Sequence, residues 1–147
     1  MYQFHATLHA APGNCPTKCR QDIDGQPMEV LDIAPGQLAA CQFACSFEDA
    51  ALHLAALERM HVEPDGSFVW VCGPDEPHWQ VDGNLYDRAG KLQFVDLKGS
   101  CTLERFDELL RSFGWPRQQL ICQLVRHGVI VDEREFRRWA NDVEPNA

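Results

Sequence analysis

The sequence predicts an α+β fold with a mixed or antiparallel sheet of about five or six strands, and three observations support this class. Residues 79–99 alternate apolar and polar side chains on both sides of a glycine-containing turn, which indicates a central β-hairpin. Residues 47–60 and 103–113 repeat apolar side chains at the three- and four-residue spacings of amphipathic helices. Residues 67–72 and 120–125 are short apolar runs of the kind found in buried strands.

The helix boundaries follow from capping signals. Ser46 and Thr102 precede the two main helices and can accept hydrogen bonds from their first turns. Asp132, followed three residues later by an acid, predicts a short last helix at about 133–140. Residues 141–147 are polar and contain proline, so we expect them to form a frayed tail.

Residues 1–45 are expected to be the least regular part of the chain. Residues 2–8 are predicted to form an edge strand and residues 28–33 a better one, separated by a loop rich in proline, glycine and polar residues. With 147 residues the chain is long enough for its own core, so we expect a single domain over 1–147.

Composition predicts a small soluble cytoplasmic protein that does not contact membranes. The first ten residues lack the basic and long apolar parts of a secretory signal, and no stretch of 18 apolar residues occurs. The seven cysteines are an odd number, which favours free thiols in a reducing compartment.

The net charge of −9 disfavours nucleic acid and anionic membranes as partners. The charges are uneven: eleven acids lie between Asp22 and Glu76 with Arg59 as the only Lys or Arg, whereas six arginines lie between Arg111 and Arg138. We interpret those arginines as the solvated surface of two helices, and the acidic half as a contact surface for a partner protein.

The hairpin brings three charged residues together if its loop has three residues, 88–90. Asp82 then lies opposite Asp96, and Lys98 shares their face together with Leu92. Two opposed carboxylates at about 5 Å repel unless a cation or a proton lies between them. Mg²⁺ would relieve this repulsion and would also polarise a phosphodiester and acidify a water molecule.

The predicted element order resembles the PD-(D/E)xK nuclease core over about half of the chain. The likeness rests on Asp82 in VDGNLYD and on Asp96 and Lys98 in VDLKG. In that family two acids hold a divalent metal, a lysine positions or activates water, and a glutamate on the preceding helix often completes the site. The resemblance therefore implies a nucleic-acid substrate and a last site residue at Glu58, or else Glu48. Asp96 stands where glutamate is commoner in the family.

Two CxxxC pairs suggest a different metal. Cys15 and Cys19 in CPTKC, with Cys41 and Cys45 in CQFAC, supply four thiolates that suit a tetrahedral zinc site. The alternative is free thiols, because the CQFAC pair leads directly into a helix where its cysteines can simply pack.

These observations leave three hypotheses for function. A non-catalytic protein-interaction or accessory module is the one we expect, because no P-loop, nucleophile elbow, dinucleotide-binding glycine pattern or HExxH motif occurs. The alternatives are a Mg²⁺-dependent nuclease and a zinc-stabilised domain. No cofactor beyond these two metal ions is predicted.

Overall fold

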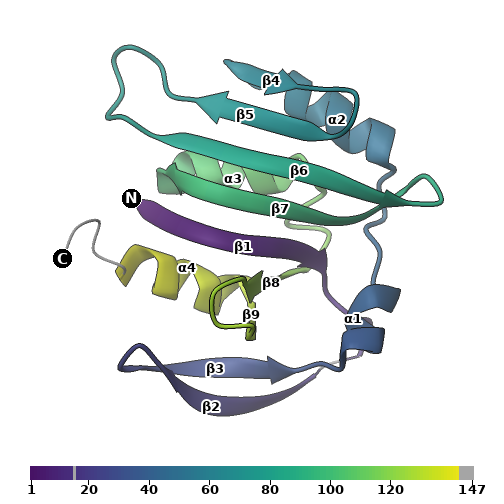
Figure 1. Cartoon of the computed structure of the whole chain (residues 1–147), viewed down its shortest axis with the longest axis vertical. Helices are drawn as coiled ribbons and strands as arrows, with labels where there is room; N and C mark the ends of the chain where they lie inside the picture. Colours follow the sequence, from purple (N-terminus) through teal and green to yellow (C-terminus); the bar gives the residue numbers. More distant parts are fainter. Residues whose placement is uncertain (15, 143–147) are drawn as a thin grey trace.

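The computed structural model describes residues 1–14 and 16–142. Within them, nine strands form one antiparallel sheet in the order β2-β3-β9-β8-β1-β7-β6-β5-β4 (Figure 1). The strands are β1 Tyr2–Ala10, β2 Thr17–Ile23, β3 Gln26–Asp32, β4 Met60–Val62, β5 Ser67–Val71, β6 Gln80–Arg88, β7 Lys91–Cys101, β8 Leu120–Leu124 and β9 Ile130–Asp132.

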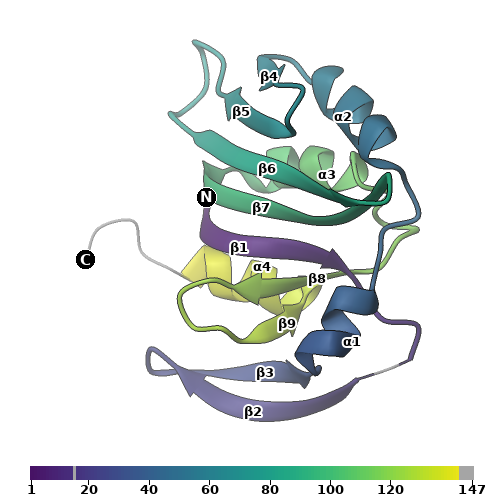
Figure 2. The ribbon, with the colours of Figure 1, turned by 45° about the vertical axis from the view of Figure 1, so that its right-hand side comes forward.

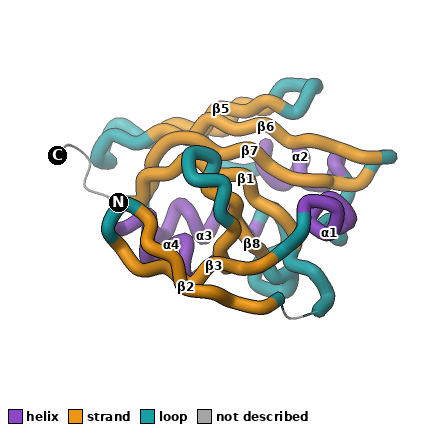
Figure 3. The backbone as a smooth tube through the Cα atoms, turned by 60° about the horizontal axis from the view of Figure 1, so that its bottom comes forward, coloured by secondary structure: helices purple, strands orange, loops and turns teal. Residues whose placement is uncertain are grey.

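Helices lie on both faces of this sheet. The described residues form α1 Pro35–Ala40, α2 Phe47–Ala55, α3 Leu103–Arg111 and α4 Glu133–Asp142. In the view of Figure 1, α3 lies behind β6 and β7, and α2 and α4 lie on the same side (Figures 1 and 2). The short α1 packs on the opposite face, near β3, β8 and β9, as its contacts show (Figure 3).

The predicted fold class is wrong in its number of strands and in its balance of sheet and helix. The sheet has nine strands among the described residues rather than five or six, with four short helices, and every pairing is antiparallel, which is one of the two arrangements that the sequence left open. Strand β2 was hidden in the sequence because six of its seven residues are exposed and show no apolar alternation. Its hairpin partner β3 follows a two-residue turn, Asp24 and Gly25, which has positive φ at both positions.

The N-terminal part is more regular than predicted. Strand β1 lies in the middle of the sheet between β8 and β7, so its assignment as an edge strand is wrong. Alternate residues of β1, including Phe4, Ala6 and Leu8, are buried in the main core. Its two partners, β7 (residues 91–101) and β8 (residues 120–124), are far from β1 in the sequence, so their pairing with β1 has no local signal.

The caps that begin the helices are confirmed. The Ser46 hydroxyl accepts a hydrogen bond from the Asp49 amide (3.0 Å), and Thr102 does the same for Arg105 (3.3 Å). The α2 helix ends at Ala55 instead of residue 60, since Arg59 adopts a positive φ and the following residues join the sheet as β4.

The core lies between the sheet and helices α2, α3 and α4. Its centre is the Phe106 ring of α3, which contacts the rings of Tyr2, Phe4 and Phe136 at centroid distances of 5.4, 5.5 and 5.6 Å. Because aromatic side chains bury large areas, this cluster dominates the packing of the covered face.

The chain end lies only partly within the structure. Asn141 and Asp142 belong to α4, and the rest of the predicted tail, from residue 143, lies outside the described residues. No helix in the described ranges combines the length and apolar character needed to cross a membrane.

Candidate functional site: the open face of the sheet

The central hairpin is present, but its loop is shorter than predicted. Arg88 pairs with Lys91, so the loop contains only Ala89 and Gly90, both with positive φ (54° and 81°). This is the backbone pattern of a type I′ turn. The ladder then shifts register, because Tyr86 pairs with Phe94 and the next residue, Asp87, pairs with Leu92. Gln93 is therefore an extra residue in β7, as in a β-bulge.

The bulge decides which side chains face the core. Leu92 is fully buried in the main core, whereas the regular register predicted it on the same face as Asp82. The prediction for Leu92 is wrong because one extra residue reverses the alternation of a strand.

The charged residues of the hairpin also pair differently. Asp82 lies opposite Lys98, and Asp96 lies opposite Asn84, so the predicted opposition of the two carboxylates is wrong. Asp82 accepts a hydrogen bond from Gln80 (2.9 Å). The two aspartates are diagonal neighbours, at a typical Cα separation of about 7–8 Å, which lessens their need for a bridging cation.

The structure places Glu58 away from this cluster. It lies in the turn after α2, its side chain is 80% exposed, and it pairs with Arg59 (3.3 Å). The other glutamate considered, Glu48, is exposed in the first turn of α2.

The cysteines of the two CxxxC pairs are dispersed as far as they are described. Cys15 lies outside the described residues, and Cys19 is exposed on β2. The Cys41 thiol donates to Gln37 O at the end of α1 (3.3 Å), and burial raises the pKa of both Cys41 and Cys45. Within residues 1–14 and 16–142, no three His, Cys, Asp or Glu side chains are grouped to hold a metal. Both metal sites stay predictions.

The more developed site is on the face that carries α1, which we call the open face. It comprises the side chains of β5, β6, β7, β1 and β8 that point away from α2, α3 and α4, together with Val125, which follows β8 beside β1. Three large apolar side chains on it are exposed, namely Val69, Tyr86 and Val125. The face results from strand alternation, since Phe4, Ala6 and Leu8 point to the core and the intervening residues of β1 point outward.

Three rings form a stack across the open face. Tyr86 of β6 stacks on Phe94 of β7, with centroids 4.4 Å apart and planes inclined by 17°. Phe94 in turn stacks on His9 of β1 at 5.6 Å and 21°. Cross-strand aromatic pairs of this kind stabilise sheets, and they also present flat apolar surface.

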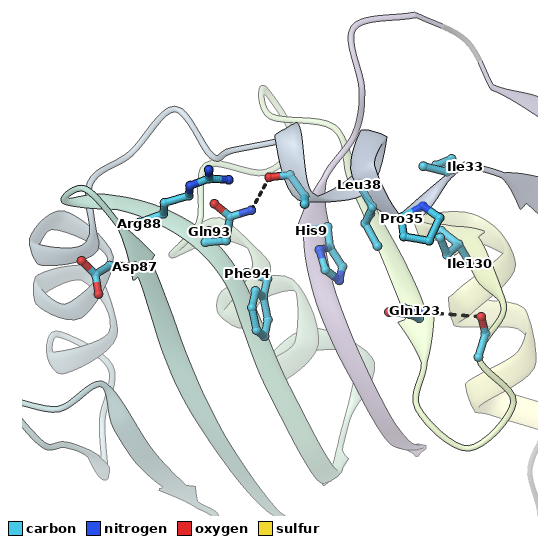
Figure 4. A pocket seen from close by; sticks show the side chains of 12 residues that line it. His9, Ile33, Pro35, Leu38, Asp87, Arg88, Gln93, Phe94, Gln123 and Ile130 are labelled. Atoms are coloured by element: carbon cyan, nitrogen blue, oxygen red, sulfur yellow. Dashed lines mark hydrogen bonds between the residues drawn. The ribbon is translucent and has the colours of Figure 1, made fainter.

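Beside this stack lies a groove of about 570 Å³, which we call the α1 groove (Figure 4). Its apolar walls are Ile33, Pro35, Leu38, Phe94 and Ile130, with His9 between them. Asp87 and Arg88 also line it, at the hairpin end. The volume is within the range typical of ligand sites, about 300–1,000 Å³.

His9 is the most unusual residue in the groove. Only 7% of it is exposed, and burial lowers its pKa to about 4, so the ring is neutral at neutral pH. Its Nε2 atom lies 2.8 Å from the Thr7 hydroxyl. Its Nδ1 atom has no hydrogen bond to any described residue and is available to a ligand.

Two glutamine side chains that line the groove form hydrogen bonds to backbone carbonyls of neighbouring elements. Gln93, the bulge residue, donates to the Ala39 carbonyl at the end of α1 (2.6 Å), and Gln123 of β8 donates to the Gly128 carbonyl (3.4 Å) (Figure 4). The bulge therefore has a local role, because it turns an amide toward α1.

Sequence reasoning did not single out the α1 groove. Its one available signal was the polar face of the hairpin, which becomes apolar near the turn at Tyr86 and Phe94. His5 and His9 share the open face because they are alternate residues of β1. Helix α1 itself has only six residues and no capping side chain, which leaves little pattern to detect.

Comparisons of this chain with known protein families, with curated proteins and with solved structures find no match.

Proposed function

We propose that the chain is a non-catalytic protein-interaction module that binds a partner protein through the open face. The α1 groove receives an uncharged apolar or aromatic side chain of that partner. The observation that carries the proposal is the groove itself, an apolar depression beside a stack of three rings on a sheet face with exposed apolar side chains.

The shape of the face suits a protein partner better than an isolated small molecule. Val69 of β5, Tyr86 of β6 and Val125 directly after β8 extend the apolar surface beyond the groove. Protein interfaces commonly combine a central pocket for an aromatic or aliphatic anchor with a surrounding polar rim. Asp82, Asp96 and Lys98 provide polar groups of this kind on the same face.

The groove favours an uncharged anchor. His9 is neutral at physiological pH, and the amide nitrogens of Gln93 and Gln123 already donate to backbone carbonyls. A charged side chain entering between Ile33, Leu38 and Phe94 would lose hydration, and the charged lining residues Asp87 and Arg88 lie only at the hairpin end of the groove. A tryptophan side chain fits the chemistry well, because its flat ring can extend the stack and its N–H can donate to a ring nitrogen.

The Thr7 and His9 pair supports binding rather than catalysis. A histidine next to a hydroxyl is the arrangement of a base and a nucleophile, but a general base works best with a pKa near the operating pH. Burial keeps the pKa of His9 near 4, and no described residue hydrogen-bonds Nδ1 to orient the ring.

The anchor site is tested with N-acetyl-tryptophanamide as an uncharged probe in protein NMR titrations. We expect saturable shifts confined to residues of the α1 groove, and their loss in Phe94→Ala. Leu103→Ser, an exposed position on α3, is the matched control and should leave the shifts intact.

The partner is tested by placing a photo-crosslinking phenylalanine analogue at position 86 or, as control, at position 103 in cells that make the protein. We expect a discrete crosslinked protein from position 86 alone, and the purified partner should bind the wild-type chain but not Phe94→Ala. Equal crosslinking from both positions, or binding that Phe94→Ala leaves unchanged, contradicts the proposal.

A further inference from the structure

A second groove lies between α2 and the edge strand β4, on a different part of the molecule from the α1 groove. Its volume is about 540 Å³. The apolar lining includes Phe47, Ala51, Leu52 and Val62, and carboxylates are contributed by Glu48 on α2 and Glu63 after β4. We call this the α2 groove.

Leu52 is the feature of the α2 groove that folding does not explain. It is 69% exposed, the largest exposure among the large apolar side chains of the described residues. Other members of the same helix, Ala50 and Leu54, are fully buried in the core, so the helix already has its core-facing stripe. A single exposed leucine is ordinary, but this one adjoins further apolar surface at Phe47 and Val62.

The charges around the α2 groove are predominantly negative. Neither Glu48 nor Glu63 forms an ion pair with another described residue. Arg59 is already paired with two other glutamates, Glu58 and Glu76. Glu48 also stabilises the N-terminus of α2 through the helix dipole, but Glu63 has no such role.

From these observations we infer that the α2 groove docks a basic segment of a partner protein, one that inserts an apolar side chain between Lys or Arg residues. Charge complementarity selects this occupant, because the two carboxylates beside the apolar lining form no ion pair within the described part of the chain. A second copy of the chain is disfavoured, since each copy has a net charge of −9. The site is independent of the function proposed for the open face.

The inference is tested by selecting random dodecapeptides displayed on phage against the immobilised full chain. We expect enriched sequences to carry an apolar residue flanked by Lys or Arg. Synthetic versions should bind more weakly as salt is raised, because exposed charge pairs are screened. Their affinity should fall about tenfold for Leu52→Ser, the loss expected for one apolar anchor. The Glu48→Gln/Glu63→Gln double variant should bind roughly threefold to tenfold more weakly at low salt.

Matched controls come from α3, where Leu103 is also exposed and is followed by the first-turn acid Glu104. Leu103→Ser and Glu104→Gln should leave peptide affinity unchanged, and thermal unfolding of every variant shows that it remains folded. Failure to enrich any peptide, enrichment without basic residues, or affinity that is insensitive to Leu52→Ser overturns the inference. Loss of binding in Phe94→Ala instead would assign the peptides to the α1 groove and would equally overturn it.

Discussion

The two faces of the sheet are built from alternate residues of the same strands, yet they differ in almost every other respect. On the covered face, the rings around Phe106 are fully enclosed in the core and meet at inclinations from 25° to 84°. On the open face, Tyr86, Phe94 and the neutral His9 stack nearly parallel beside a groove, and Tyr86 is exposed. The difference suggests that the covered face stabilises the fold and the open face is free to bind.

The largest expected effect tests this division of roles directly. Phe106→Ala should lower the free energy of unfolding by about 3–5 kcal/mol, because it leaves a cavity in a packed core. Phe94→Ala on the open face should cost less, about 1–2 kcal/mol, since the ring is only half buried and water can enter the space. Urea unfolding measures both values, and equal losses would mean that the open face is part of the core.

The second test uses the pH dependence of His9. Its pKa is about 4 in the fold and ordinarily near 6.5, so between these values the unfolded chain binds a proton that the folded chain does not. Stability should therefore fall as the pH is lowered from 6.5 toward 4, by up to about 3 kcal/mol from this residue. The carboxylates titrate in the same region, so the measured quantity is the difference between wild type and His9→Gln. Parallel pH curves for the two proteins would show that His9 is not buried as described.

The third test concerns the register that assigns residues to the two faces. Gly99 has a φ of 141°, and a Cβ at this position would overlap the Gln80 carbonyl oxygen of β6. Gly99→Ala should cost about 1–3 kcal/mol. Gly90→Ala, in the exposed turn with open space around it, suffers only the backbone strain, about 1 kcal/mol. Chemical denaturation compares the two, and a larger loss at Gly90 would contradict the hairpin register.

The fourth test separates stability from binding on the open face. Tyr86 is 41% exposed, so Tyr86→Ser should change the free energy of unfolding by no more than about 1 kcal/mol. The same change should weaken binding of the partner protein, because it removes one ring of the stack. Calorimetric titration with the purified partner provides the measurement, and unchanged affinity would exclude Tyr86 from the interface.

The last test needs no substitution, because it compares the reactivity of exposed and buried thiols in the wild-type protein. Cys101 and Cys122 point to the covered face, and burial raises the pKa of both, that of Cys101 to about 12. Cys19 is exposed on β2. A thiol reagent should modify Cys19 in the native state and should reach the two buried cysteines only after unfolding. Mass spectrometry of the labelled chain identifies the modified positions, and rapid labelling of Cys122 would show that the core opens.

Part of the candidate site was visible in the sequence. Alternation in the hairpin correctly assigned Asp82, Asp96 and Lys98 to one face, because side-chain direction in a strand has a period of two residues. The same rule failed at Leu92, where a bulge interrupts the period. Bulges leave no reliable pattern in a single sequence, so counting residues from the turn could not reveal the change of register.

Elements with local signals can be located from the amino-acid sequence without knowledge of the fold. Capping side chains specify where α2 and α3 begin, and apolar periodicity specifies which of their sides is buried. Three other features could be seen only in the folded chain: β1 lies at the centre of the sheet, β2 pairs although it is exposed, and His9 lies beside Phe94 next to α1. These features depend on contacts between segments far apart in the chain, where pairing and burial outweigh local propensity.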